Sequence, residues 1–554
     1  MEKNFEQKKQ DGSIVNQSKV LQSKPEHELI QERLKKLDEM RKRGINPYPY
    51  SFDVTHHADD LLKKYHHLQA QEHTTDFVKV AGRIMALRDM GKLIFGHVQD
   101  ASGKIQFLLK ENKNIENKNE GDNTNNTNNT TNQNKDVNEK DVSEKNKELL
   151  SLVKLLDLGD IIGVEGIIFK TKTGEVTIEV SSLTVLCKSL KPMPDKFHGI
   201  QDQEIKYRKR HLDLIMNPEV RMVFIQKAKI LAGFREFLDG RAFIEVETPI
   251  LQPVYGGANA RPFITHHNSL NFDMYLKISP ELYLKRLIVG GFERVYDLGK
   301  CFRNEGTDKT HNPEFGEIEW YQAYADYNDM MDMVEDLFVY LAMKIHNKTE
   351  FEFQGKLISF KKPWKRISMI DAIFEIGKID TEKYSDAELK ELVTTYNLEI
   401  EGTVSRGTII QALFEHLCEA ELIQPTFIID HPVETSPLTK VHRTKKGLVE
   451  RFELFMNGWE LANAYSELTD PQDQRARLEE QAKQRAEGYE EAQPMDEDFV
   501  QAIEQGMPPT GGIGVGYDRL VMLLLNQPIL RDVLLFPTMK PQVQDRIEHH
   551  KEDT

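Results

Sequence analysis

The feature that most restricts the fold is a series of short, β-rich runs between Phe77 and Val185. Turn signals separate the runs, whose sequences are VKVAGRI, GKLIFGHVQD, GKIQFLL, GDIIGVEGIIF and VTIEVSSLTVL. Short, evenly spaced strands of β-branched and aromatic residues, bounded by glycine-containing turns, are typical of all-β sandwiches and barrels. We therefore predict a small β-barrel in this part of the chain.

A tract dominated by Asn, Lys, Glu and Thr interrupts the predicted barrel at residues 112–148. It contains no aromatic residue and almost no apolar one. Such a segment cannot bury enough apolar surface to offset the entropy that it would lose on ordering. We predict a disordered loop inserted at a corner of the barrel.

The rest of the chain predicts a second, larger domain. A chain of 554 residues is too long for one hydrophobic core. From about Lys191 the strand-like runs ERVYDLGKCFRNE and FGEIEWYQAYADY alternate with stretches of helical periodicity. This pattern favours an antiparallel sheet that carries a polar site on one face. In FLDGRAFIEVETPIL, a helix is expected to lead into a buried strand that ends near Pro249.

Composition excludes several classes of protein. The net charge of −16 argues against a nonspecific coat for nucleic acid, because neutralising phosphates needs an excess of Lys and Arg. No run is long and apolar enough to span a membrane and the start is polar, so we expect a cytoplasmic protein without membrane contact. Cys187, Cys301 and Cys418 are widely separated and the paired histidines lack companion ligands, so we expect no disulfide and no zinc.

Apolar residues recur at helical spacing from Glu26 to Gly44, which predicts an amphipathic helix. Basic residues occupy other positions of the same helix: Arg33, Lys35, Lys36, Arg41, Lys42 and Arg43. They form either a local basic surface for nucleic acid or a merely solvated helix face.

Three separated segments carry the most specific signals. They are FLDGRAFIEVETPIL from Phe237, FRNEGTDKTHNPEF from Phe302 and GGIGVGYDRLVMLL from Gly511. In this order they resemble the three signature motifs of class II aminoacyl-tRNA synthetases. The strings GGANARPFITHHNSLNFDMYLKISPELYLKRLIVGG and NGWELANAYSELTDPQDQ resemble the lysine-specific, bacterial-type branch of that family. The resemblance extends from about Glu26 to Pro541.

The resemblance implies an α+β protein with an oligonucleotide-binding (OB-fold) barrel and a class II catalytic domain, an antiparallel sheet flanked by helices. The predicted segments are a disordered polar extension (1–25), a helix and OB-fold anticodon-binding domain (26–190) interrupted by the Asn-rich tract (112–148), the catalytic domain (191–541) with a helical insertion (about 359–430), and a polar tail (542–554). In this class the first motif forms a two-fold interface, so the resemblance also implies a homodimer.

The second motif suits nucleotide chemistry. Activating a carboxylate with ATP builds charge on the phosphoryl oxygens, and a planar, bidentate cation stabilises that charge, a role that we assign to Arg303. By resemblance, ATP is held by Arg303, Glu305, His311, Asn312, Phe315, Gly516 and Arg519. Phe315 is expected to stack on the base and Arg519 to reach the γ-phosphate.

Gly512, Gly514 and Gly516 alternate along the third motif. A dinucleotide-binding fold needs a different glycine spacing and an acidic residue further along the chain, so the string alone is a weak signal for that fold. Under the synthetase resemblance, positions without side chains let a substrate lie flat against the strand.

Two carboxylates, Glu453 in RFELF and Glu460 in WELAN, correspond in the family to ligands of ATP-bound Mg²⁺. Mg²⁺ binds through a few carboxylates together with phosphate oxygens and waters, so two glutamates beside a triphosphate are sufficient. The alternative is a pair of salt-bridged structural glutamates.

Selecting lysine requires a negative group at the far end of a long pocket, because one methylene of difference gives only about 1–3 kcal/mol. The resemblance implies that Glu467 and Tyr321 bind the ε-ammonium group, and that Glu281 and the backbone at Gly257 hold the α-amino group. The remaining positions implied for lysine are Glu319, Asn463, Tyr465 and Gly514.

The predicted barrel fits recognition of an anticodon loop, since OB-folds bind single-stranded bases by stacking and edge hydrogen bonds. By resemblance Phe95 stacks on an anticodon base, with polar contacts from Arg88, Gln106 and Glu175. The alternative for Phe95 is an ordinary aromatic residue of the barrel core.

Together these features predict a lysine-activating ligase that uses ATP with Mg²⁺ and charges tRNA(Lys). The nearest alternatives are the aspartyl and asparaginyl members, whose pockets should present a cation to the substrate where Glu467 and Tyr321 stand here. Relatives that transfer lysine to a protein lack the barrel. An RNA-binding scaffold with an inactive catalytic fold would not need Arg303, Glu453, Glu460 and Arg519 intact.

Overall fold

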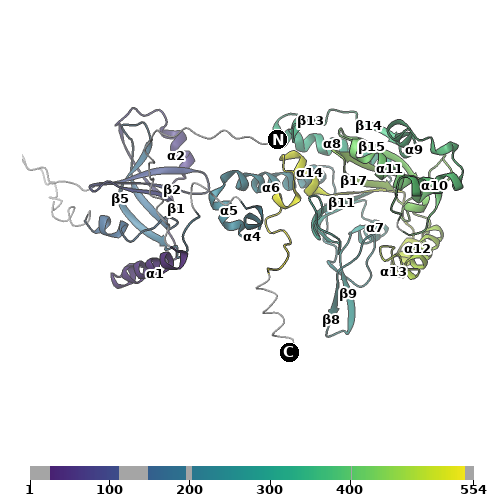
Figure 1. Cartoon of the computed structure of the whole chain (residues 1–554), viewed down its shortest axis with the longest axis horizontal. Helices are drawn as coiled ribbons and strands as arrows, with labels where there is room; N and C mark the ends of the chain where they lie inside the picture. The colour runs from purple at the N-terminus through teal and green to yellow at the C-terminus, as the bar shows by residue number, and fades with distance from the viewer. Residues whose placement is uncertain (1–24, 111–146, 195–201, 401, 543–554) are drawn as a thin grey trace, which may run out of the picture. The chain divides into compact units, whose positions relative to one another are not determined.

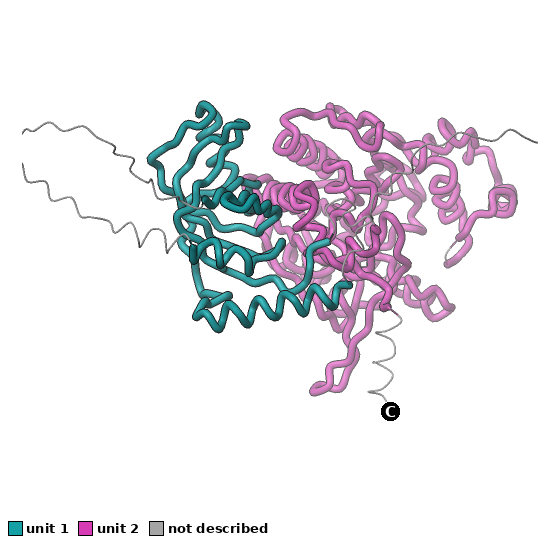
Figure 2. The backbone as a smooth tube through the Cα atoms, turned by 60° about the vertical axis from the view of Figure 1, so that its left-hand side comes forward, with its two compact units in different colours: residues 1–199 teal, residues 200–554 magenta. Residues whose placement is uncertain are grey.

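The computed structural model describes residues 25–110, 147–194, 202–400 and 402–542. The chain divides into two compact units, residues 1–199 and 200–554 (Figure 2). Apart from their outermost residues, the predicted extension 1–25, the insertion 112–148 and the tail 542–554 lie outside the described residues. Within the described ranges, no helix has both the length and the apolar character needed to cross a bilayer.

Unit 1 is built around a closed, five-stranded barrel (Figure 1). Its strands are β1 (His73–Asp89), β2 (Leu93–Gln99), β3 (Lys104–Lys110), β4 (Ile161–Lys170) and β5 (Val176–Cys187). Neighbouring strands follow the order β1-β2-β3-β5-β4, and β4 pairs antiparallel with β1 to close the barrel. The predicted barrel is therefore confirmed.

Side chains of the barrel strands alternate between its core and its outer surface, as the two-residue period of a strand requires. In β2, Ile94 and Val98 point into the apolar core, whereas Phe95 and His97 are partly exposed on the opposite face. The outer face of this strand therefore carries an aromatic and a polar side chain that are partly exposed to solvent.

Helix α1 (Glu26–Lys42) confirms the predicted amphipathic helix, and α2 (Ala58–Tyr65) packs beside β3. The Arg33 guanidinium is buried and donates to three backbone carbonyl oxygens, those of Leu158, Ser189 and Lys191. Placing Arg33 on a free basic surface was therefore wrong, because its charge fastens α1 to the barrel.

Unit 2 contains an eight-stranded sheet. In spatial order its strands are β14 (Lys365–Ser368), β15 (Thr426–Pro432), β16 (Leu448–Met456), β17 (Trp459–Ser466), β18 (Thr510–Val515), β11 (Glu314–Ala323), β10 (Arg294–Phe302) and β6 (Ile244–Glu245). The strands from β15 to β10 are antiparallel, and parallel pairs occur at the two edges. The predicted antiparallel sheet with flanking helices is confirmed.

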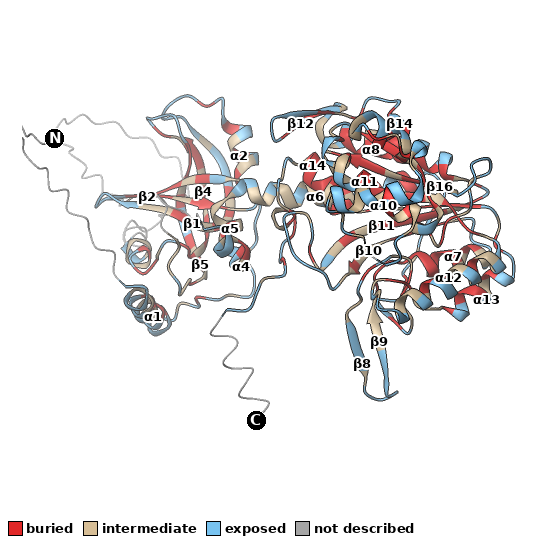
Figure 3. Ribbon diagram, turned by 45° about the vertical axis from the view of Figure 1, so that its right-hand side comes forward, coloured by how far each residue is buried: buried red, intermediate tan, exposed pale blue. Residues whose placement is uncertain are grey.

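Helices pack on both faces of this sheet. Helices that contact its strands include α6 (Pro218–Asp239), α7 (Glu281–Val289), α8 (Tyr327–His346) and α14 (Tyr517–Leu524). Outside them, α13 (Glu497–Glu504) packs on α7 and α12 (Pro471–Ala486) on α13, while α5 (Arg210–Met216) packs between α6 and α4 (Gln203–Arg208). Ile318 and Trp320 of β11 share a core with α6, α8 and α14, whereas Tyr321 shares another core with α7 and α13. The buried residues therefore lie on both sides of the sheet, as the red segments of Figure 3 show.

The buried strand predicted in FIEVETPIL is not present. Only Ile244 and Glu245 form β6, and both are exposed at the sheet edge, where they pair with Val295 and Tyr296. The chain then leaves the ladder, because Thr248 donates its hydroxyl to Asp297 and Pro249 has no N–H group to contribute. Two small sheets complete the strands: β7 (Leu251–Gln252), β9 (Phe272–Leu276) and β8 (Ile264–His267) in one, β12 (Glu350–Phe353) and β13 (Lys356–Ser359) in the other.

The stretch expected to be a helical insertion, about 359–430, begins and ends near strands of the main sheet. Strands β14 and β15 are parallel neighbours, and such neighbours need a crossover connection rather than a hairpin. The connection contains α9 (Met369–Ala372), a π-helical turn (Ile373–Gly377), α10 (Asp386–Thr395) and α11 (Arg406–Leu417). These helices form a core of their own against Ile367 and Ile428 of the two strands.

Candidate functional site

The second and third motif segments converge on a cavity of about 990 Å³ over one face of the eight-stranded sheet, whereas no residue of the first motif lines it. With one exception, the residues predicted to bind ATP, metal and amino acid line it: Gly257, Glu281, Arg303, Glu305, His311, Asn312, Phe315, Glu319, Tyr321, Glu453, Glu460, Asn463, Tyr465, Gly514, Gly516 and Arg519. The exception, Glu467, lies behind the wall. One cavity thus contains groups that the sequence distributes over more than 260 positions.

Strand β11 supplies the floor of the cavity, because its odd-numbered residues all point to the same face. These residues are Phe315, Glu317, Glu319 and Tyr321. In the sheet register, Gly514 of β18 lies beside Glu319 of β11 and, on its other side, beside Asn463 of β17. A glycine in the middle keeps the space between these two polar side chains open.

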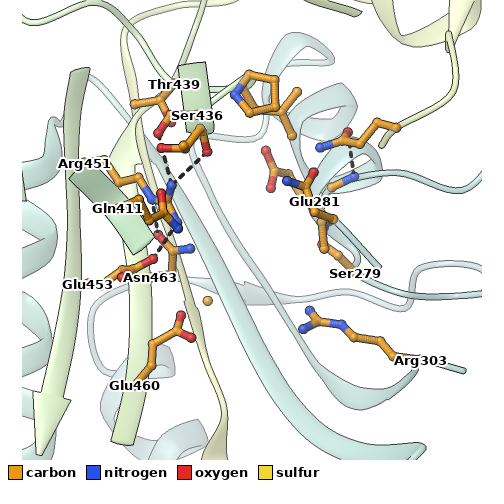
Figure 4. Close-up of a pocket in the computed structure, with 18 of the residues that line it drawn as sticks. Ser279, Glu281, Arg303, Gln411, Ser436, Thr439, Arg451, Glu453, Glu460 and Asn463 are labelled. Carbon is orange, nitrogen blue, oxygen red and sulfur yellow. Dashed lines mark hydrogen bonds and ion pairs between the residues drawn. The ribbon is translucent and has the colours of Figure 1, made fainter. Parts of the chain in front are cut away.

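Arg303 extends into the cavity from the end of β10. Its Nη2 atom is 4.0 Å from Glu317 Oε1, and its guanidinium group lies 4.9 Å from the centroid of the Phe315 ring. Burial lowers the pKa of Arg303, but Glu317 together with the neighbouring Cys301, Glu305 and Glu460 more than offsets this, so the net shift is upward. Figure 4 shows Arg303 and Glu460 reaching into the same space from opposite sides.

The second and third motifs are joined by a direct hydrogen bond. Arg519 Nη2 lies 2.9 Å from His311 Nε2, and His311 Nδ1 lies 2.8 Å from Asp308 Oδ2. Since Arg519 can only donate, His311 accepts at Nε2 and carries its proton at Nδ1. Arg519 Nη1 also donates to the backbone oxygen of Glu460, 2.6 Å away. The Arg519 guanidinium is therefore held at the edge of the cavity from two sides.

Hydrogen-bond acceptors and open space lie near Arg303 and Arg519, in the loop after Arg303 and at the start of α14. The buried Asn312 donates its Nδ2 group to the backbone oxygen of Glu314, and its Oδ1 atom has no hydrogen-bond partner within the described part of the chain. Glu305 is exposed at the rim. A Cβ atom at Gly516 would meet no atom within 4 Å, so the start of α14 is open to a ligand.

Glu453 and Glu460 face the cavity from the adjacent strands β16 and β17 (Figure 4). Arg451 Nη2 donates to Glu453 Oε1 at 2.6 Å. Burial, and next the Glu453 carboxylate, raise the pKa of Glu460. Over the residues that the structure describes, no group of three or more His, Cys, Asp or Glu side chains is arranged to hold a metal. The pair therefore offers two carboxylates and leaves further coordination positions open.

The other end of the cavity is enclosed by carboxylates and phenols. Glu281 Oε2 accepts from the Tyr465 hydroxyl at 2.6 Å. Glu319 accepts from Ser279 Oγ at 2.7 Å and from the Tyr321 hydroxyl at 3.0 Å. Burial, followed by neighbouring carboxylates, raises the pKa of Glu319 well above its usual range. The hydroxyl groups orient these carboxylates but carry no positive charge.

Glu467 lies behind Gly512, and its carboxylate forms an ion pair with the buried Lys285 of α7. A Cβ atom at Gly512 would lie 2.1 Å from Glu467 Oε1 and 2.3 Å from the Tyr321 ring, so only glycine fits between them. Lys285 Nζ also donates to Glu281 Oε1 at 2.6 Å. Burial raises the pKa of Glu467, and Lys285 partly reverses that shift.

The residues predicted to contact an anticodon share the outer face of the barrel. Arg88 of β1 is exposed and is the register partner of Phe95 in β2. Glu175 accepts from Gln106 Nε2 at 2.7 Å, and its other oxygen lies 2.7 Å from His97 Nε2. Phe95 points away from the barrel core. The alternative interpretation, an aromatic residue of that core, is therefore wrong.

Four residues of these two sites were missed in the sequence. His97 stands two positions from Phe95 and therefore on the same strand face, and Arg451 stands two positions before Glu453. Glu317 has the same relation to Glu319. Lys285 stands four positions after Glu281, which places both on one side of a helix. The two-residue period of a strand and the four-residue spacing of a helix would have identified these neighbours. Neither pattern shows which of them are buried.

The model of the tRNA synthetases class II (D, K and N) matches residues 202–540. A lysine–tRNA ligase of Carboxydothermus hydrogenoformans is 48% identical over 93% of this chain and 99% of its own length. One of Thermoanaerobacter sp. is 48% identical over 93% and 97%, and one of Clostridium perfringens is 47% identical over 92% and 96%.

The fold and the cavity both fit the family that the comparisons give. The eight-stranded sheet and its helices carry the three motifs, and the matched region contains every residue of the cavity. The relatives match along almost their full lengths, barrel included. The chain belongs to the class II tRNA synthetases of the D, K and N group, in the family of the lysine–tRNA ligases.

Proposed function

We propose that the protein activates L-lysine with ATP and transfers it to the 3'-terminal ribose of tRNA(Lys). The observation that carries the choice of lysine is the set of buried carboxylates at one end of the cavity: Glu281, Glu319 and Glu467. A buried negative end stabilises a cationic side chain and opposes an acidic or amide one.

The reaction has two steps. First, an oxygen of the lysine carboxylate forms a bond to the α-phosphorus of ATP, and the bond between that phosphorus and the bridging oxygen breaks, so that lysyl-adenylate forms and pyrophosphate leaves. Next, a hydroxyl group of the terminal ribose attacks the carbonyl carbon, and AMP leaves. Neither step needs a side-chain nucleophile, so the protein contributes positioning and charge stabilisation.

Arg303 and Arg519 are the cations placed to meet the phosphates. Arg303 stays charged beside Glu317 and reaches the centre of the cavity, which suits the α-phosphate. Arg519, held by His311, lies at the edge of the same cavity and suits the γ-phosphate. Phe315 and the free Oδ1 acceptor of Asn312 are placed to contact the adenine base.

The glutamate pair fits a Mg²⁺ ion that enters with ATP. Glu453 and Glu460 repel each other in a buried setting, and a divalent cation would relieve that repulsion. Mg²⁺ takes few protein carboxylates and fills its remaining positions with phosphate oxygens and water. When bound, the ion would supply charge neutralisation for the triphosphate. Arg451 would keep the Glu453 carboxylate aimed at it.

The amino acid would lie between the arginines and the carboxylates. Tyr321 and Glu467 would bind the ε-ammonium group, which would reach Glu467 past Gly512 because this glycine has no side chain. Glu281 with the backbone at Gly257 would bind the α-amino group. Asn463 and Tyr465 would form the walls, and Gly514 would allow close approach to β18. An aspartate or asparagine substrate would bring no cation to this end, which argues against those two specificities.

The barrel would recognise the anticodon through Phe95, with Arg88, Gln106 and Glu175 beside it. We further propose a homodimer, since the first motif leaves Ile244, Ile250 and Leu251 exposed as apolar surface that a second copy would cover. Because its RNA substrate serves translation, the protein would work in the cytoplasm.

ATP–pyrophosphate exchange with each of the twenty amino acids supplied singly tests this function. Lysine alone should support exchange. Exchange with aspartate or asparagine would refute the assignment of the carboxylate end. If none of the twenty amino acids supports exchange, the proposed activation is refuted altogether.

A further inference from the structure

Lys285 is a fully buried lysine at the end of the cavity where we propose that another lysine binds. It belongs to α7, and its side chain is 0% exposed. Its Nζ atom is 2.6 Å from Glu281 Oε1 and forms an ion pair with Glu467. It also lies 5.5 Å from the centroid of the Tyr465 ring and 5.9 Å from that of Phe499. A single ammonium group thus connects the two carboxylates assigned to opposite ends of the substrate.

The charges at this end do not balance. The titratable groups that face Lys285 are Glu281 on α7, Tyr465 on β17 and Glu467 just after β17. Glu319 and Tyr321 on β11 are in turn close to Glu281. Among the described residues at this end, Lys285 is the cation that pairs with these carboxylates. Two carboxylates, Glu281 and Glu467, therefore share one ammonium group, the buried Glu319 lies near Glu281, and an excess of negative charge is left for a ligand.

We propose that Lys285 is a positioning residue that determines how tightly the cavity binds lysine. Its ammonium group holds Glu281 and Glu467 in a fixed relation, so that the two carboxylates can accept the two ammonium groups of the substrate. Lys285 itself does not touch the cavity surface, because Gly512, Tyr321 and Tyr465 form the wall there. The inference rests on the proposed function.

The directions of the pKa shifts agree with this geometry. Burial lowers the pKa of Lys285, but Glu281 and Glu467 raise it above its usual value. Burial and Glu281 raise the pKa of Glu467, and Lys285 lowers it. Removing the Lys285 charge should therefore raise the pKa of Glu467 further. More of this carboxylate would then be protonated near neutral pH, and a protonated carboxyl group cannot pair with the substrate ammonium.

The test compares Lys285→Met with Lys285→Arg in ATP–pyrophosphate exchange. Methionine removes the charge at similar length, whereas arginine retains a charge. Lys188→Met is the matched control, because Lys188 in unit 1 is also fully buried between two carboxylates, Asp157 and Asp160. We measure KM for lysine, KM for ATP and kcat for each variant at about pH 6.5 and about pH 8, on either side of neutrality. If Lys285→Met does not fold, Lys285→Gln removes the charge instead.

We expect Lys285→Met to raise KM for lysine about 30-fold at the lower pH, equivalent to about 2 kcal/mol. The increase should shrink at the higher pH, as Glu467 ionises, and KM for ATP should stay within about 2-fold of the parent. Lys285→Arg should restore much of the lysine affinity, and Lys188→Met should not change it.

Two results would overturn the inference: an unchanged KM for lysine in Lys285→Met, or an equal rise in KM for lysine and KM for ATP without pH dependence. Either would be seen with a parent enzyme that shows lysine-dependent exchange. If the parent itself shows none, the proposed function fails instead.

Discussion

Two fully buried lysines, one in each unit, are each held by two carboxylates. In unit 1, Lys188 donates to Asp157 and Asp160. A second cation, Lys36, pairs with Asp157 at 2.6 Å, and the backbone N–H groups of Asp157 and Ser189 donate to Asp160. In unit 2, Lys285 pairs with Glu281 and Glu467, and Glu319 lies near Glu281. The first cluster has as many cations as carboxylates, and the second has fewer.

The two clusters therefore hold their carboxylates in different states. Burial raises the pKa of Asp157, but Lys188 and Lys36 reverse this, and the net shift is downward. The net shifts of Glu319 and Glu467 are upward. A buried cluster with equal numbers of cations and carboxylates needs no charged ligand and contributes to stability. A buried cluster with more carboxylates than cations favours the binding of a cationic ligand. Burial alone does not distinguish a structural ion pair from a binding site.

The largest effect that should separate the clusters is that of Glu467→Gln. The variant keeps the shape of the side chain but removes the charge assigned to the ε-ammonium group, which would then be buried without a counter-charge. We expect KM for lysine in ATP–pyrophosphate exchange to rise about 10³-fold or more. KM for ATP should change little, because Arg303 and Arg519 are at the other end of the cavity. An unchanged KM for lysine would refute the role of Glu467.

Lys188→Met should act on stability instead. It leaves Asp157 and Asp160 with one fewer partner, and breaking a buried pair on one side costs about 3–5 kcal/mol. Urea unfolding followed by circular dichroism should show the unit 1 transition at lower denaturant, while KM for lysine stays at the parent value. A lysine-specific loss of affinity in this variant would contradict the division of roles between the two lysines.

Phe95→Ala tests the outer face of the barrel that Lys188 helps to stabilise. Stacking of a base on an aromatic ring is worth about 1–3 kcal/mol, so kcat/KM for charging tRNA(Lys) should fall about 5- to 150-fold. Exchange without RNA should be unaffected. Phe77→Ala, which removes another exposed aromatic of the same barrel, is the control and should charge normally. Equal charging by both variants would refute the stacking assignment.

The pH dependence of lysine binding should show the smallest effect. Burial and Glu281 raise the pKa of Glu467 to about 8, although Lys285 lowers it. Because only the ionised carboxylate pairs with an ammonium group, KM for lysine should decrease several-fold as the pH rises from about 6.5 to about 8. The pKa of Asp157 is shifted downward instead, so this carboxylate stays ionised and should contribute no change to the free energy of unfolding over this range. A flat KM profile would place Glu467 outside the lysine site.

The sequence was informative where local pattern decides the structure. The barrel strands follow from β-rich runs between turns, and β10 and β11 from alternating polar and apolar residues. The order of the eight strands could not be predicted, since it depends on pairing between segments far apart, such as β18 with β11. Strand β6 was overestimated, because the apolar residues of FIEVETPIL suggested burial that an edge position does not provide.

The site was predictable only through residues that recur in known motifs. Lys285 was missed because a lysine in an amphipathic helix is normally expected to be solvated. What makes it unusual, the two carboxylates around it, comes from positions 4 and 182 residues away. Arg33 was placed on a surface for the same reason, although three backbone carbonyl groups surround its guanidinium. Burial of a charge is a property of the fold that local sequence does not encode.

The most direct test of the unbalanced cluster is to count protons when lysine binds. Calorimetric titration of lysine into the protein near pH 7, in two buffers with different ionisation enthalpies, measures the net number exchanged. If a carboxyl group with a raised pKa must ionise to meet the incoming ammonium group, the parent should release protons on binding, and Lys285→Met should release more. Binding with no net proton exchange would show that these carboxylates are already fully ionised, and would contradict the account.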